Sequence, residues 1–73
     1  MKTLAEVSAF LDSLGVGYVV EPSEVRGATT RIRCGIGAYE SNQQHAKVGG
    51  YAGFYTSFEF DSAGNFIEMG AWE

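Results

Sequence analysis

The sequence has few of the residues that build disulfide-stabilised proteins and metal sites. Its 73 residues include one cysteine, Cys34, one histidine, His45, and one proline. A single cysteine excludes an intramolecular disulfide and a multi-cysteine zinc site, so we expect no metal and no cofactor. A chain that forms no disulfide suits a reducing compartment, and we therefore expect a cytoplasmic protein.

Long apolar runs are also missing from the sequence. No stretch approaches the roughly 20 apolar residues that cross a bilayer. Residues 1–3 lead directly into an amphipathic pattern rather than into a signal peptide. We therefore expect a soluble protein that does not associate with membranes.

Basic residues are few and unevenly placed. Five lysines and arginines stand against nine acids, for a formal net charge of −4 at pH 7. Phosphate contacts need a basic surface, so we expect no direct binding to nucleic acid. Residues 22–34 contain three arginines and one glutamate, whereas residues 57–73 contain four acids and no base. The chain therefore has a basic middle and an acidic end.

Length and apolar content predict a single folded domain, residues 1–73. Hydrophobic residues make up 45% of the chain, and five Phe, four Tyr and one Trp supply ten aromatic rings. A chain of this size buries about 60% of its unfolded surface, and its free energy of unfolding should be roughly 4–11 kcal/mol. We expect the free protein to be a monomer.

The N-terminal segment predicts a helix over residues 4–14. Thr3 and Glu6 have the spacing of a capping box, in which a hydroxyl and a carboxylate each accept from a backbone amide. Gly15 or Gly17 offers a left-handed residue at which the helix can end. The apolar residues at helical spacing are Leu4, Val7, Phe10, Leu11 and Leu14.

Two shorter segments have the composition of strands. Residues 18–20 are β-branched and aromatic, and Pro22 ends that strand or confines it to a sheet edge. From Thr29 the pattern alternates: Ile32, Cys34 and Ile36 point one way, and the arginines between them point the other way. This alternation predicts a half-buried strand with an arginine-bearing outer face.

Residues 51–73 predict a long β-hairpin with its turn at residues 61–64. One face of its first strand carries Phe54, Thr56, Phe58 and Phe60, and the other carries Tyr55, Ser57 and Glu59. A register slip of one residue would exchange the two faces. Because the hairpin holds most of the large apolar side chains, we expect the core to be built on it.

The polar segment 37–50 joins the two halves. It is too long for a tight turn, and a loop of this length is functional or mobile; residues 41–47 could form one helical turn. Short connections elsewhere favour antiparallel neighbours. We therefore predict an α+β fold, with one N-terminal helix packed on a four-stranded, mainly antiparallel sheet.

Three groups of residues are candidates for a reaction centre. Cys34 with His45 as its base is one, but an inward position between two isoleucines favours a small structural cysteine, and we expect a solvated histidine. Residues 49–53 are glycine-rich but have neither the Lys-Ser/Thr of a phosphate-binding loop nor a following helix, which indicates flexible backbone before the hairpin. Glu59 and Glu68 are expected to be cross-strand neighbours on a solvated face. We predict that the protein is not an enzyme.

Arginine and tyrosine on the outer surface favour a binding role instead. We predict that Arg31, Arg33, Tyr39, Tyr51 and Tyr55 contact a protein partner, because Tyr, Trp and Arg dominate protein-binding hot spots. The alternative is that these tyrosines pack on an open sheet face and need no partner.

In size and layout the chain resembles the small phage-encoded regulators of bacterial RNA polymerase. The resemblance lies in residues 4–15, Leu-Ala-Glu-Val-Ser-Ala-Phe-Leu-Asp-Ser-Leu-Gly, and in residues 58–66, Phe-Glu-Phe-Asp-Ser-Ala-Gly-Asn-Phe. It implies a protein in the bacterial host cytoplasm that docks on the polymerase and alters initiation or termination without catalysis. Those regulators share no signature, so the resemblance transfers no binding residue by position.

The function that we expect is therefore a non-catalytic protein-binding regulator that inhibits or redirects host transcription. One alternative is an acidic nucleic-acid-mimicking inhibitor of another host enzyme, whose binding would collapse with added salt. Another is a small structural or assembly protein, which would self-associate. A small enzyme or ligand carrier would need a pocket between segment 37–50 and the hairpin.

Overall fold

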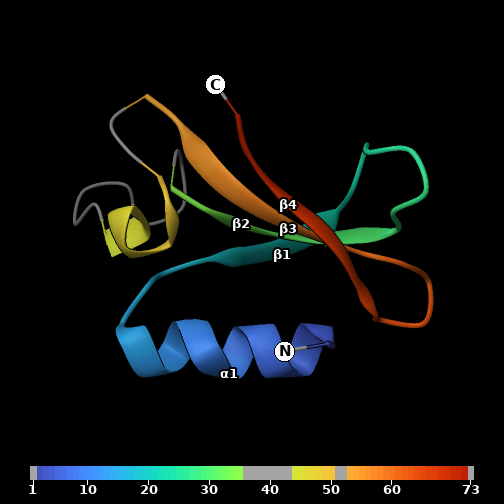
Figure 1. Cartoon of the computed structure of the whole chain (residues 1–73), viewed down its shortest axis with the longest axis horizontal. Helices are drawn as coiled ribbons and strands as arrows, with labels where there is room; N and C mark the ends of the chain where they lie inside the picture. The colour runs from blue at the N-terminus through green and yellow to red at the C-terminus, as the bar shows by residue number, and fades with distance from the viewer. Residues whose placement is uncertain (1, 36–43, 51–52, 73) are drawn as a thin grey trace.

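The structure has two layers, one helix and one four-stranded sheet (Figure 1). The computed structural model describes residues 2–35, 44–50 and 53–72. Its elements are α1 (Leu4–Leu14), β1 (Val19–Pro22), β2 (Thr30–Cys34), the 3₁₀ helix η2 (Gln44–Val48), β3 (Tyr55–Phe60) and β4 (Phe66–Trp72). The strands follow the order β1-β2-β3-β4, and each neighbouring pair is antiparallel. The predicted α+β fold is confirmed.

The helix α1 begins and ends where the sequence predicts. The N–H of Glu6 donates to Thr3 Oγ1 at 3.2 Å and the N–H of Thr3 donates to Glu6 Oε1 at 3.1 Å, which completes the capping box. Gly15 follows with a left-handed φ of 73°, which glycine adopts without strain. Lys47 of η2 donates from Nζ to the carbonyl of Leu14 at 2.8 Å, and so satisfies one of the acceptors that a helix end leaves open.

The core lies between α1 and the sheet. Leu11 of α1, Ile32 of β2 and Phe60 of β3 have no exposed surface. The predicted inward positions of β2 and β3 are confirmed for these strands, whereas Ile36 lies outside the described residues. The buried apolar side chains are Val7, Leu11, Val16, Ile32, Cys34, Phe58 and Phe60.

The strand β3 is buried on both of its faces. Phe58 and Phe60 point toward α1, and Ser57 and Glu59 alternate with them on the other side. Ser57 and Glu59 are nevertheless 0% and 1% exposed. The sequence predicted a solvated outer face at Glu59, and this was wrong because other segments cover the face.

The turn of the hairpin is confirmed at residues 61–64. Asp61 Oδ1 accepts from the backbone N–H groups of Ala63 and Asn65, each at 2.9 Å. Gly64 completes the turn with a φ of 83°. An Asp that bonds to the backbone two residues ahead is a recognised turn former, so this part of the hairpin is locally encoded.

The prediction for Pro22 is confirmed, and one detail of the hairpin was not specified by the sequence pattern. β1 ends at Pro22, which has no N–H, and it is an edge strand. In the hairpin Glu59 pairs with Glu68, as predicted, but Phe60 pairs with Phe66, so β4 has one extra residue at this point. Such a bulge bends the strand and increases its twist.

Replacement of Leu11 by alanine tests the packing of the core. A Leu→Ala change at a fully buried site costs about 2–5 kcal/mol, which is a large part of the free energy of unfolding expected for this chain. We expect Leu11→Ala to lower the midpoint of urea unfolding strongly. Phe10→Ala is the control, because Phe10 lies in the same helix and is 38% exposed. Equal losses in the two variants would contradict this packing.

Candidate protein-binding surface

The sheet face opposite α1, which we call the outer face, gathers side chains from all four strands. Three of the predicted contact residues, Arg31, Arg33 and Tyr55, lie on it; Tyr39 and Tyr51 lie outside the described residues. The rows across the strands are Glu21-Arg31-Glu59-Glu68, then Val19-Arg33-Ser57-Gly70, then Tyr55-Trp72. The register therefore places arginines, acids and aromatic rings next to one another.

Glu21 holds both arginines in place. Arg31 and Arg33 donate from Nε to Glu21 Oε2 at 2.6 and 3.1 Å, and Arg33 also donates from Nη1 to the carbonyl of Gly35 at 3.2 Å. Both guanidinium groups lie over the Tyr55 ring, 5.5 and 5.8 Å from its centroid, within reach of a cation–π interaction. The arginine side chains are only 20% and 18% exposed. Arg31, Arg33, Glu21 and Tyr55 therefore form a fixed group, which we call the arginine platform.

A segment after β1 folds over the outer face and buries Glu59. The hydroxyl of Ser23 donates to Glu59 Oε1, and the same hydroxyl oxygen accepts from the N–H of Val25 at 3.0 Å. The segment is anchored to the sheet where the N–H of Thr29 donates to the carbonyl of Phe60 at 2.8 Å. Glu59 therefore lies beneath residues 23–29, which explains why its predicted exposure was wrong.

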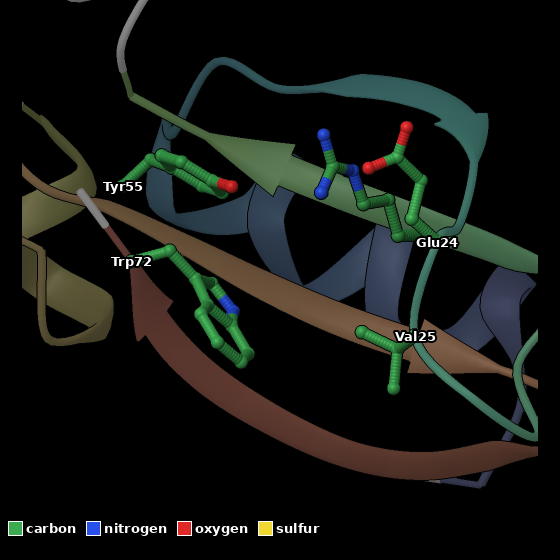
Figure 2. A pocket seen from close by; sticks show the side chains of 5 residues that line it. Glu24, Val25, Tyr55 and Trp72 are labelled. Carbon is green, nitrogen blue, oxygen red and sulfur yellow. The ribbon is translucent and has the colours of Figure 1, made fainter.

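Trp72 and the segment over Glu59 border an open cavity of about 390 Å³. The indole Nε1 of Trp72 donates to Ser57 Oγ at 2.8 Å, and the ring crosses Gly70 so closely that a Cβ there would lie 3.1 Å from Nε1. Figure 2 shows Tyr55 and Trp72 on one side of the cavity, with Glu24 and Val25 opposite them. The cavity is lined by Glu24, Val25, Arg31, Tyr55 and Trp72.

Some parts of this surface were not foreseen from the sequence. Trp72, Glu24 and Val25, which line the cavity, are not among the contact residues predicted from the sequence. Glu21 was not expected to bind the arginines, because the predicted strand covered residues 18–20, whereas β1 includes Glu21. Its pairing depends on the register of β1 with β2, where Glu21 is opposite Arg31, and no local pattern gives that register.

Cys34 is not placed for nucleophilic chemistry. It has no exposed surface, and desolvation raises the pKa of its thiol to about 11. At neutral pH the thiol therefore stays protonated, whereas the thiolate is the reactive form. This agrees with a structural cysteine at the inward position of β2.

His45 is buried rather than solvated, so that expectation was wrong. It is 3% exposed and its ring packs against the backbone of Gly35 and Gly50. A Cβ at Gly35 would lie 2.7 Å from His45 Cδ2, and one at Gly50 would lie closer still. Gly50 is thus required by the close approach of the imidazole ring, not by flexibility before the hairpin.

Comparisons with protein-family models, characterised proteins and solved structures gave no match to this chain. Within the described residues, His, Cys, Asp and Glu side chains form no group of three or more that could hold a metal ion. The helices that the structure describes include none with the length and apolar character needed to cross a membrane. No known protein therefore indicates what the outer face binds.

The thiol of Cys34 provides a direct test of its burial. We expect a disulfide reagent such as Ellman's reagent to react very slowly with the folded protein at pH 8. After unfolding in guanidinium chloride it should titrate one thiol per chain rapidly, because both exposure and a normal pKa favour the thiolate. Rapid reaction of the folded protein would contradict the position of Cys34.

The pKa of Glu21 tests the arginine platform. The hydrogen bond from Arg33 is the largest cause that lowers this pKa from 4.5; burial opposes it, and the bond and charge of Arg31 lower it further. The stability that the pairing contributes is therefore present above pH 4.5 and lost as the pH falls through the lower, folded pKa.

We expect an NMR titration to give Glu21 a midpoint below 4.5, and Arg33→Met and Arg31→Met each to raise it. Arg33 is the largest cause of the lowered pKa of Glu21, but Arg31 makes the shorter contacts with this carboxylate. Both arginines are therefore replaced in turn. Arg26→Met is the control, because the exposed Arg26 makes no described contact with Glu21. An unchanged midpoint in both platform variants would show that the arginines do not hold the carboxylate in solution.

Proposed function

We propose that this chain is a small, non-catalytic protein-binding regulator and that it contacts its partner through the outer face. The proposal rests on one observation: Arg31, Tyr55 and Trp72 meet around a single cavity. These three residue types dominate protein-binding hot spots, and such residues usually work as compact clusters.

The rigidity of this cluster supports the proposal. Trp72 is 45% exposed, yet its indole N–H is held by Ser57, and the guanidinium of Arg31 is held by Glu21. Side chains that are fixed before binding lose little conformational entropy in the complex. Two guanidinium groups share one carboxylate, so the platform itself has a net charge of +1. Glu24 adds a carboxylate to the lining of the same cavity. The cavity suits a partner that inserts an apolar side chain beside Trp72.

The partner that we propose is bacterial RNA polymerase. This part of the proposal comes from the resemblance in size and layout to small phage-encoded regulators of that enzyme. A ligand of this kind can occupy a site that another subunit needs, or can stabilise one conformation of the enzyme. Either mode would inhibit or redirect transcription in the bacterial cytoplasm without chemistry.

The acidic residues give no comparable support to nucleic-acid mimicry. Such a mimic needs an array of exposed carboxylates. On the outer face Glu21 is bound to two arginines and Glu59 is buried, which leaves Glu68 and Glu24 as the exposed acids there. We therefore argue for protein binding alone.

Binding to purified bacterial RNA polymerase tests the partner and the surface together. We expect the immobilised protein to capture the enzyme at physiological salt. Trp72→Ala should weaken binding about 30-fold or more, because loss of a hot-spot residue costs about 2 kcal/mol or more. Trp72→Phe keeps an aromatic ring but loses the donor to Ser57. Its affinity for the polymerase should therefore lie between that of the wild-type protein and that of Trp72→Ala.

Phe10→Ala is the matched control, because it removes an exposed aromatic ring from the helix rather than from the outer face. It should leave the affinity unchanged. An equal loss with Phe10→Ala would move the contact to α1. Failure of the folded wild-type protein to bind polymerase would overturn the proposed partner.

A further inference from the structure

The strand β4 forms a long, apolar edge of the sheet. It spans seven residues and lies at one end of the strand order, with β3 as its neighbour. Within β4 the only charged residue is Glu68. The exposed large apolar side chains of β4 are Phe66, Ile67, Met69 and Trp72. An edge of this kind presents backbone N–H and C=O groups to which another strand can pair.

The opposite edge of the sheet is protected. β1 has four residues and ends at Pro22, and both a short strand and a proline prevent the addition of a further strand. β4 is nearly twice as long and contains no proline. Figure 1 shows β4 along the outside of the sheet. The two edges of the sheet therefore differ in their capacity to accept a partner.

The N-terminal segment covers only the beginning of β4. The N–H of Phe66 donates to the carbonyl of Lys2 at 2.7 Å, and the N–H of Leu4 donates to the carbonyl of Gly64 at 2.9 Å. Among the described residues, no further backbone hydrogen bond of this kind reaches the outer side of residues 67–72. The described residues therefore leave the remaining length of the edge open for pairing.

Glu68 decides which kind of strand fits this edge. It is opposite Glu59, which is buried and whose Oε2 has no hydrogen-bond partner among the described residues. In the same part of the chain, no ion pair involves either carboxylate. Two like charges in directly opposed positions are destabilising. Arg31 of β2 is the other cross-strand neighbour of Glu59, so a further cation would reduce the repulsion on the side of Glu68 that faces away from β3.

A second copy of β4 would not supply that cation. Antiparallel pairing of two β4 strands about Met69 would bring two Glu68 side chains onto one face as diagonal neighbours, and β4 contains no base. In that register the charge arrangement disfavours a homodimer at this edge. It favours a strand that carries a lysine or an arginine.

We propose that an extended segment of a partner protein adds to β4 as a further strand, with apolar side chains and one basic residue beside Glu68. Backbone hydrogen bonds would provide affinity, and the basic side chain would provide selectivity. Trp72 belongs both to this edge and to the cavity, but strand addition uses the backbone groups of β4 rather than the side chains of the cavity, so the inference does not depend on the polymerase proposal.

Synthetic peptides provide the test. The first peptide has seven residues, the length of β4, with alternating threonine and valine around a central lysine; the second has glutamate at the centre. We expect the lysine peptide to shift the amide NMR signals of β4 and to slow their hydrogen exchange. It should bind about three- to tenfold more tightly than the glutamate peptide.

Charge exchange and backbone methylation are the controls. Glu68→Lys should reverse the preference between the two peptides, and because Glu68 is exposed the signals of α1 should not move. A fully N-methylated lysine peptide keeps every side chain but has no backbone donors. It should bind at least about tenfold more weakly, since each backbone hydrogen bond contributes roughly a factor of two to ten.

Several results would overturn the inference. One is equal affinity for the two peptides, or no binding of either. Another is a perturbation centred on Tyr55 and Arg31, which would place the peptide in the cavity. Protection of β4 that rises with protein concentration alone would identify a second copy as the occupant. If the peptides fail while polymerase still binds, only strand addition is rejected; if polymerase fails while the peptides bind, only the polymerase proposal is rejected.

Discussion

The structure depends on the burial of β3 from both sides. Phe58 and Phe60 pack against α1 on one side, while Ser57 and Glu59 are covered on the other. A central strand in this position fixes the register of its neighbours, because a shift of one residue would move the phenylalanines out of the core and the polar pair into it. The pairs along β2 and β4 therefore follow from the packing of β3.

That register also determines how the charges on the outer face are shared. Arg31 stands between Glu21 in β1 and Glu59 in β3, and its hydrogen bond goes to Glu21. Glu59 then takes its hydrogen bond from Ser23, since a buried carboxylate needs a donor. Ser23 belongs to residues 23–29, which lie over the outer face of the sheet. The cavity lies between this segment and Trp72.

The two proposed contacts use different properties of the same sheet. The cavity offers side chains that are already fixed, so a partner would be recognised by the shape and charge of an inserted residue. The edge of β4 offers backbone groups, so a partner would be recognised by its extended conformation and by one basic residue. Both proposed surfaces include residues of β4.

The sequence by itself determined the features that arise within a few residues of the chain. The capping box of α1, the turn at Asp61 and the alternation along β3 are local patterns, and each was predicted correctly. Three of the five predicted contact residues lie together on the outer face, because alternation assigns them to it.

Only the tertiary structure decided what covers each face. The burial of Glu59 and His45, the binding of both arginines to Glu21, and the cavity at Trp72 all depend on segments that are distant in sequence. A period of two tells which side chains share a face, but it carries no information on whether another segment will fold over that face. This is the physical reason why the strands were predicted and the candidate site was predicted only in part.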